Sequence, residues 1–298
     1  MILKIGSRGK EVKLLQEFLQ ILADGIFGQG TETAVCRWQT KNNLDVDGIV
    51  GPATWDAMGL ATTDIEEAPK TFDKDTYHTL SGLTVHQHML PTDEYMTGSK
   101  PEYIFLHHTA GWHNPFRTID HWGRDSRGKV ATEFVLGGQS IKGNDDEYDG
   151  VLVQCTPQGG WGWHLGTGRS HMHKNSVGIE VNNFGWIKNG KTYAGTKADP
   201  SQLVTLAKPF RGYTTWHRYS DKQIEVLKDW ILWIGERDGI DIREGLPKLI
   251  KSVGADAFEY IQDVRDGKLK GLWTHTNVRK DKVDMFPQQE LLDMLVSL

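Results

Sequence analysis

Two histidines and an aspartate, far apart in the sequence, have the side-chain types that best suit metal chemistry. His107 directly follows an apolar, aromatic run at residues 103–106, and His275 and Asp284 lie nine residues apart near the carboxy terminus. Two imidazoles and one carboxylate commonly hold a catalytic zinc ion, because they leave a fourth position for water. Structural zinc sites instead rely on cysteines, and this chain has only two, Cys36 and Cys155. Their spacing in the sequence alone does not distinguish these two histidines from the other histidines of the chain.

Short runs of aromatic and β-branched residues predict the strands that position these side chains. The predicted strands are residues 103–106, 134–136, 151–154 and 177–181, and the predicted helices are residues 116–122, 220–237 and 287–296. This mixture predicts an α/β or α+β domain built on a central sheet. Residues 186–219 and 239–272 are insertions whose shape the sequence does not predict.

An acidic residue interrupts the most apolar of these strands. Within residues 177–181, alternation places Gly178 and Glu180 on the face opposite Val177, Ile179 and Val181. An acid in such a strand is either at a sheet edge or functional. Burial would raise its pKa and suit it to proton transfer, whereas a nearby cation would lower that pKa.

The amino-terminal segment contains an internal repeat. The pentapeptides D-G-I-F-G (24–28) and D-G-I-V-G (47–51) lie 23 residues apart, and a helical pattern follows each. Asp-Gly is a turn signal, and apolar residues between 12 and 19 have the spacing of a helix with one buried face. Residues 1–62 are therefore predicted to form a small, all-α, three-helix domain.

The composition changes after this domain. Residues 63–78 are rich in Thr, Asp, Glu and Lys and lack apolar periodicity, which predicts a solvated linker. Residues 79–298 then form the predicted catalytic domain.

Charge and hydropathy exclude several classes of partner. The formal net charge is −5, so neither nucleic acid nor an anionic membrane is an expected partner. The apolar runs are far shorter than the ~18 to 20 residues of a membrane-spanning helix, so membrane insertion is not expected. The first ten residues lack the apolar stretch of a secretory signal peptide, and the protein is expected to start in the cytoplasm.

Four motifs read in order resemble the zinc amidases of the N-acetylmuramoyl-L-alanine amidase type 2 superfamily, which includes phage endolysins and peptidoglycan recognition proteins. The motifs are I-F-L-H-H-T-A-G (104–111), W-H-L-G (163–166), N-S-V-G-I-E-V (175–181) and H-T-N-V-R-K-D-K-V-D (275–284). The amino-terminal segment resembles a peptidoglycan-binding domain through G-S-R-G-x-E-V-x-x-L-Q (6–16) and both Asp-Gly turns.

The resemblance implies a role for each matching residue. His107, His275 and Asp284 match the zinc ligands of the family, and Lys282 matches its lysine near the developing oxyanion. Glu180 matches the acidic catalytic residue of those members that use one. Residues 163–166 and Asn175 would line the groove for the peptide stem.

The chain departs from the family at one catalytic position. Where some phage members carry a tyrosine ahead of an aromatic strand, this chain has Thr132, which cannot serve as a phenol. Glu180 is therefore the preferred base, and Glu133 is a second acidic candidate.

The resemblance implies a Zn²⁺-dependent peptidoglycan hydrolase that cleaves between N-acetylmuramic acid and L-alanine and contacts both the glycan strand and the peptide stem. With no signal peptide, a phage endolysin is expected, held in the host cytoplasm before release to the cell wall or periplasm, where it acts as a monomer and causes lysis. Two alternatives stay open: a non-catalytic peptidoglycan recognition protein, and a zinc peptidase acting on the stem. The complete ligand set argues against the former, and the absence of an H-E-x-x-H helix removes the commonest form of the latter.

Overall fold

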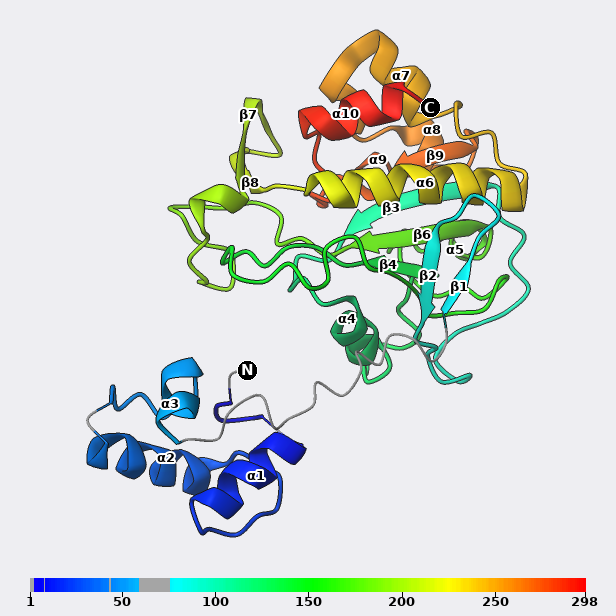
Figure 1. Cartoon of the computed structure of the whole chain (residues 1–298). Coiled ribbons are helices and arrows are strands. Elements are labelled where there is room, and N and C mark those ends of the chain that lie inside the picture. The colour runs from blue at the N-terminus through cyan, green and yellow to red at the C-terminus, as the bar shows by residue number, and fades with distance from the viewer. Residues whose placement is uncertain (1–2, 8, 43, 59–75) are drawn as a thin grey trace. The chain divides into compact units, whose positions relative to one another are not determined.

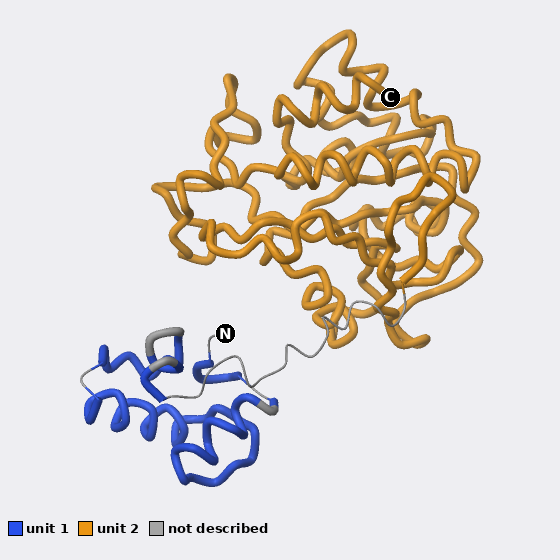
Figure 2. Tube along the Cα trace, in the orientation of Figure 1, with its two compact units in different colours: residues 1–71 blue, residues 72–298 orange. Residues whose placement is uncertain are grey.

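The computed structural model describes residues 3–7, 9–42, 44–58 and 76–298. The chain divides into two compact units, residues 1–71 and residues 72–298 (Figure 2). The predicted linker, residues 63–78, falls mostly on residues 59–75, which lie outside the described residues. The predicted domain boundaries therefore stay a prediction.

The described part of the first unit contains three helices, as the repeat predicts. They are α1 (Lys10–Phe18), α2 (Gln29–Lys41) and α3 (Pro52–Ala57). Their inner faces enclose a small apolar core that includes Val12, Leu15, Val35 and Trp55, all almost fully buried. The predicted all-α amino-terminal fold is confirmed for these residues.

Each Asp-Gly turn of the repeat is held by a glutamine from the preceding helix. The side-chain amide of Gln16 donates to Asp24 Oδ1 at 2.8 Å, and its oxygen accepts the backbone N–H of Gly25 at 2.8 Å. Gln39 makes the equivalent contacts to Asp47 Oδ1 at 2.8 Å and to the N–H of the next glycine, residue 48, at 3.0 Å. Both turn glycines have φ near +70°, which other residues rarely adopt. The sequence repeat is thus a repeated hydrogen-bond network.

A seven-stranded mixed sheet forms the centre of the second unit, with strand order β1-β2-β5-β4-β6-β3-β9 (Figure 1). The strands are β1 (Thr76–His78), β2 (Thr84–Gln87), β3 (Tyr103–His108), β4 (Phe134–Leu136), β5 (Leu152–Gln154), β6 (Ser176–Val181) and β9 (Gly271–Thr274). β3 runs parallel to both β6 and β9, whereas β4 is antiparallel to β5. The strands predicted from residue type are confirmed.

Helices cover both faces of this sheet (Figure 1). They are α4 (Pro115–Trp122), α5 (Ser170–Lys174), α6 (Asp221–Asp238), α7 (Leu246–Val253), α8 (Gln262–Arg265), α9 (His275–Val278) and α10 (Gln289–Val296). The inner side of α6 packs with the apolar face of β6, and α4 packs on the other face with β4 and β5. Ser220 begins α6 with a capping box that also uses Gln223, which fixes where the longest helix starts. The predicted mixed sheet flanked by helices is confirmed.

The segments without a predicted shape are ordered elements. Residues 203–217 form an antiparallel hairpin of β7 (Leu203–Phe210) and β8 (Tyr213–His217). Residues 239–272 contain α7, α8 and the first half of β9. No helix among the described residues is long and apolar enough to cross a membrane.

Candidate metal centre

Two neighbouring strands bring the predicted metal ligands together. His107 lies near the end of β3, and His275 directly follows β9, the parallel neighbour of β3. Because the carboxyl ends of parallel strands meet at one edge of a sheet, these two side chains share that edge. Asp284 lies in the following loop, and its backbone carbonyl accepts the N–H of Thr276 at 3.1 Å. The loop is therefore fastened to the helix that carries His275.

One atom of each residue points at a common centre. His107 Nδ1 lies 3.1 Å from His275 Nδ1 and 3.4 Å from Asp284 Oδ2, and His275 Nδ1 lies 2.9 Å from Asp284 Oδ2. All three residues are at least 93% buried, with exposures of 0%, 5% and 7%. The structure thus unites the three residues that the sequence analysis selected.

The local electrostatics favour a cation among these atoms. Burial lowers the pKa of His107 to about 4, so its ring is neutral at neutral pH. Burial alone would raise the pKa of Asp284, but the neighbouring imidazoles, first His275 and then His107, hold that pKa well below its usual value. A neutral ring nitrogen and a carboxylate are both electron-pair donors.

The spacing of the three atoms also fits a metal ion, and these residues form the one group of at least three possible ligands found among the described residues. Tetrahedral zinc with bonds of about 2.0 to 2.1 Å separates its ligand atoms by about 3.3 Å. The observed separations, 2.9 to 3.4 Å, are close to that value. The donor set and its geometry both suit zinc.

Glu180 lies beside this centre on the adjacent strand. It pairs in register with His107, and paired residues of parallel strands project from the same face of the sheet. The residue is partly exposed, but its Oε2 is buried and has no hydrogen-bond partner among the described residues. Burial, and next the charge of Asp284, raise its pKa well above the usual value. Glu180 can therefore hold a proton next to the three ligand atoms.

Lys282 contributes a positive charge to the same edge. Its ammonium lowers the pKa of both His107 and Glu180. The side chain is half-buried. The positive charge of Lys282 therefore influences two groups of the candidate centre.

Two other residues singled out in the sequence lie elsewhere. Glu133 is buried in a two-pronged ion pair with Arg237, at 2.7 and 3.0 Å, and also accepts a hydrogen bond from Gln154. Its oxygens are engaged by these partners, so Glu133 is placed as a structural group. Asn175 precedes β6 and accepts the N–H of Tyr103, at the strand ends opposite the metal ligands. The expected place of Asn175 in the substrate groove stays a prediction.

The structure also adds residues whose role the sequence analysis missed. His164 Nδ1 lies 3.0 Å from His107 Nε2, and the carbonyl of Leu165 lies 3.0 Å from His275 Nε2. Both residues belong to the W-H-L-G motif, which was assigned only to a groove. The motif itself was the sequence signal for these residues. Their partners are distant in the sequence: His164 lies 57 residues from His107, and Leu165 lies 110 residues from His275.

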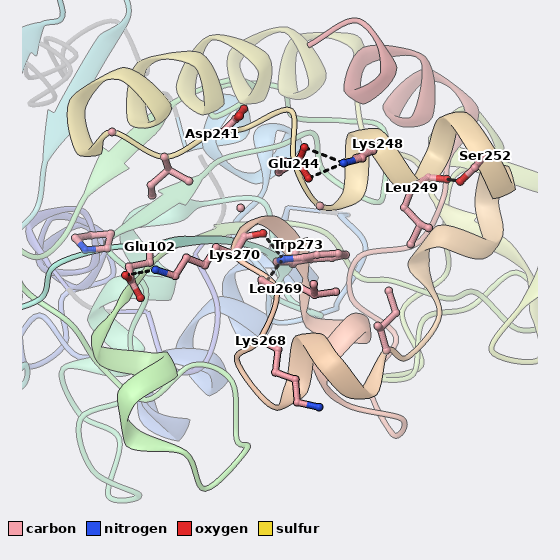
Figure 3. A pocket seen from close by; sticks show the side chains of 16 residues that line it. Glu102, Asp241, Glu244, Lys248, Leu249, Ser252, Lys268, Leu269, Lys270 and Trp273 are labelled. Carbon is pink, nitrogen blue, oxygen red and sulfur yellow. Dashed lines mark hydrogen bonds and ion pairs between the residues drawn. The ribbon is translucent and has the colours of Figure 1, made fainter.

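A cavity of about 980 Å³ lies at the other end of β3 and β9 (Figure 3). Trp273, Leu249 and Leu269 line it. At its rim Lys270 pairs with Glu102, and Lys248 pairs with Glu244. None of the candidate metal ligands lines this cavity.

Comparison with known families assigns both units. The sequence model of a family described as N-acetylmuramoyl-L-alanine amidase matches residues 97–281. A second model, described as a putative peptidoglycan-binding domain, matches residues 8–58. The first match includes His107, Glu180 and His275 but ends before Lys282 and Asp284. The geometry of the site is therefore separate evidence for Asp284.

Three solved structures are similar to parts of this chain. A peptidoglycan-binding protein from Clostridioides difficile is 44% identical over 20% of this chain and 40% of its own, with a TM-score of 0.19. An endolysin of the Burkholderia phage AP3 is 36% identical over 20% of this chain and 24% of its own, with a TM-score of 0.19. The structure of PlyL is 13% identical over 65% of this chain and 84% of its own, with a TM-score of 0.37. The match thus spans less than half of the first two proteins.

Proposed function

The chain belongs to the N-acetylmuramoyl-L-alanine amidase family, and from that membership we propose that it hydrolyses the amide bond between N-acetylmuramic acid and L-alanine in peptidoglycan. The observation that carries the proposal is the convergence of His107 Nδ1, His275 Nδ1 and Asp284 Oδ2 within 3.4 Å of one another. We propose that these three atoms hold Zn²⁺. When bound, zinc supplies Lewis-acid polarisation of the scissile carbonyl and acidifies a water molecule to a pKa of about 7.

Glu180 is the proposed general base and acid. Its carboxylate takes a proton from the attacking water and then gives that proton to the departing amine of L-alanine. The position of Glu180 beside His107 in the paired strands supports this role. Its raised pKa supports the acid half of the cycle, and a bound cation would lower that pKa and favour the base half.

Lys282 is proposed to stabilise the negative charge that develops on the carbonyl oxygen. A fixed cation at this point helps because the charge is larger in the transition state than in the substrate. The effect of Lys282 on the pKa of Glu180 supports its proximity to the reacting groups.

The first unit is proposed to bind the wall and so raise the local concentration of the catalytic unit. Tethering makes each further encounter intramolecular and needs no new contact at the active site. The match of residues 8–58 to a peptidoglycan-binding domain supports this role. Deleting residues 1–60 should weaken binding to purified sacculi more than it slows cleavage of a soluble muropeptide.

Mass spectrometry of digested sacculi tests the proposed reaction directly. The expected products carry a free lactyl carboxyl on muramic acid and a new amino terminus on L-alanine. A new amino terminus within the stem would instead identify a peptidase. Binding to sacculi with no new termini, in zinc-loaded protein, would identify a recognition protein.

We extend the proposal, from the sequence resemblance, to an endolysin that lyses a phage host as a monomer. The expected outcomes are a fall in turbidity of permeabilised host cells and a monomer mass in light scattering. Sacculi that are cleaved in extracts while permeabilised cells stay intact would contradict the lytic role.

A further inference from the structure

One short segment contacts the far side of both imidazole ligands. The Nε2 atom of His107 meets the side chain of His164, and the Nε2 atom of His275 meets the backbone carbonyl of Leu165, each at 3.0 Å. These are the ring nitrogens that do not point at the metal centre. Hydrogen bonds at this position fix the tautomer and orientation of a ligand histidine.

The direction of the hydrogen bonds can be worked out from a chain of contacts that ends at the backbone. The carbonyl of Met172 can only accept, so the hydroxyl of Ser176, 2.7 Å away, donates to it. Ser176 Oγ therefore accepts from His164 Nε2 at 2.9 Å. In neutral His164 this leaves Nδ1 as an acceptor, so the Nε2–H of His107 donates to it. The Nδ1 atom of His107 then presents a lone pair to the centre.

The second ligand is fixed more simply. The carbonyl of Leu165 is an acceptor only, so His275 Nε2 must carry a proton. When the ring is neutral, His275 Nδ1 also presents a lone pair. The two contacts therefore prepare both rings for a cation, whether or not one is bound.

A third histidine holds the contacting segment in place. His173, on α5, accepts the backbone N–H groups of both His164 and Leu165 at its Nδ1, at 3.0 and 3.2 Å. Its ring is 1% exposed and packs edge-on against Trp163 with ring centres 4.9 Å apart. Its Nε2 has no hydrogen-bond partner among the described residues. The hydrogen bonds of the ring are thus directed to this segment.

We propose that His173 is a positioning residue that sets the metal affinity of the centre, because it fixes the segment that orients His107 and His275. The inference rests on the proposed metal centre. His173 itself makes no hydrogen bond, within the described part of the chain, to the three ligand side chains. Its effect must therefore pass through His164 and Leu165.

Two substitutions of matched size test the inference in the full-length protein. His173→Leu removes the acceptor, whereas His173→Asn keeps an oxygen near the position of Nδ1. The zinc affinity of each variant is measured by competition with a chromophoric chelator at pH 7.5, and the Co²⁺ absorption spectrum reports the geometry. The leucine variant should bind zinc about 10- to 100-fold more weakly with an altered spectrum. The asparagine variant should regain most of the affinity.

His171→Leu is the control, because His171 lies on the same short helix but is exposed. It should bind zinc as the wild type does. A second route tests the same segment: His164→Leu should weaken zinc binding and His164→Asn, which can still accept from His107, should restore it. This pair keeps the test decisive if His173→Leu does not fold.

The outcomes separate this inference from the proposed function. If the wild type binds no zinc, both the metal centre and the positioning role fail. If the wild type binds zinc and folded His173→Leu binds it equally well, the positioning role alone fails. Equal weakening by leucine and asparagine at position 173 would also overturn it, because packing rather than the acceptor would then matter.

Discussion

The two units of this protein each bury a polar network, and the networks differ in one respect. Around Gln16 and Gln39, donors meet acceptors: the amide group donates to a carboxylate and the amide oxygen accepts a backbone N–H. Around His107, His275 and Asp284, three groups that act as acceptors when the rings are neutral face one another within 3.4 Å. The first arrangement is complete in itself, and the proposed cation would complete the second.

This difference distinguishes a structural polar network from a functional one, and it does not depend on the size or shape of any cavity. A buried polar group normally has a partner, because leaving it without one costs about 1 to 3 kcal/mol. Several buried acceptors that face one another therefore need a further partner, which here is the proposed ion. The large cavity lined by Trp273 shows no such convergence.

Removing the proposed ion should have the largest effect on activity. Dialysis against a chelator should abolish wall hydrolysis, because the centre then loses its Lewis acid, and added zinc should restore it. His275→Ala should lose activity by several orders of magnitude and should not respond to zinc. Release of soluble fragments from sacculi measures both. Full activity in protein verified to be free of metal would refute the ligand assignment.

Glu180→Gln should separate catalysis from zinc binding in the second unit. The loss of the proton carrier should lower kcat by about 10² to 10⁴-fold, while zinc binding is kept. Glu133→Gln is the matched control: it alters a buried acid whose partner is Arg237, so it should change stability but leave zinc binding and most of kcat. Single-turnover hydrolysis of a muropeptide gives the rates. A wild-type rate in Glu180→Gln would assign the base elsewhere.

Gln39→Ala should break the complete network of the first unit. The substitution leaves the N–H of Gly48 and the carboxylate of Asp47 without their glutamine, at a cost of about 2 to 3 kcal/mol. Gln16→Ala removes the equivalent contacts and should cost a similar amount. Hydrogen exchange of the amides in the two turns measures the loss. Cleavage of a soluble muropeptide should not change in either variant.

The smallest expected effect is on the pH dependence of the free energy of unfolding, through His217. This buried histidine accepts a hydrogen bond at its Nδ1 atom. The N–H of Phe184 donates to His217 Nδ1 at 3.1 Å, and burial lowers the pKa of His217 to about 3. This value lies below the 6.5 of the unfolded chain, so the unfolded state binds the proton first. The contribution to stability is complete above pH 6.5 and is lost as the pH falls towards 3. At pH 5 the loss is about 2 kcal/mol.

His217→Asn provides the reference for that measurement, because asparagine can accept the same N–H but does not titrate. Urea unfolding at pH 7.5 and pH 5 should show a larger loss for the wild type than for the variant. An equal loss in both proteins would assign the pH dependence to the other buried histidines.

The sequence analysis found the parts of the site that depend on local pattern. The strand ahead of His107 is an unbroken apolar run, and the alternation around Glu180 shows which face the acid occupies. The ligand set itself came from a resemblance, since nothing local distinguishes His275 from other histidines. Local pattern and family motif together predicted the fold and the convergence of the ligands.

Other contacts lay beyond local reasoning because their partners are distant in the sequence. His164 contacts His107 across 57 residues, and Glu133 contacts Arg237 across 104. Before pairing is known, an acid such as Glu133 looks equally suited to catalysis or to an ion pair. The sequence does not predict the hairpin of β7 and β8, because most of its residues are partly or fully exposed and show no clean alternation.

The strand order also has a consequence for synthesis. β3 lies in the first half of the chain, but its outer neighbour β9 is the last strand to leave the ribosome, and Asp284 follows later still. A product terminated between residues 72 and 283 lacks at least one of the three proposed ligands, yet it contains the whole amino-terminal unit. On the proposed roles of the two units, such chains would bind the wall but not hydrolyse it, because translation must pass residue 284 before all three ligands are present.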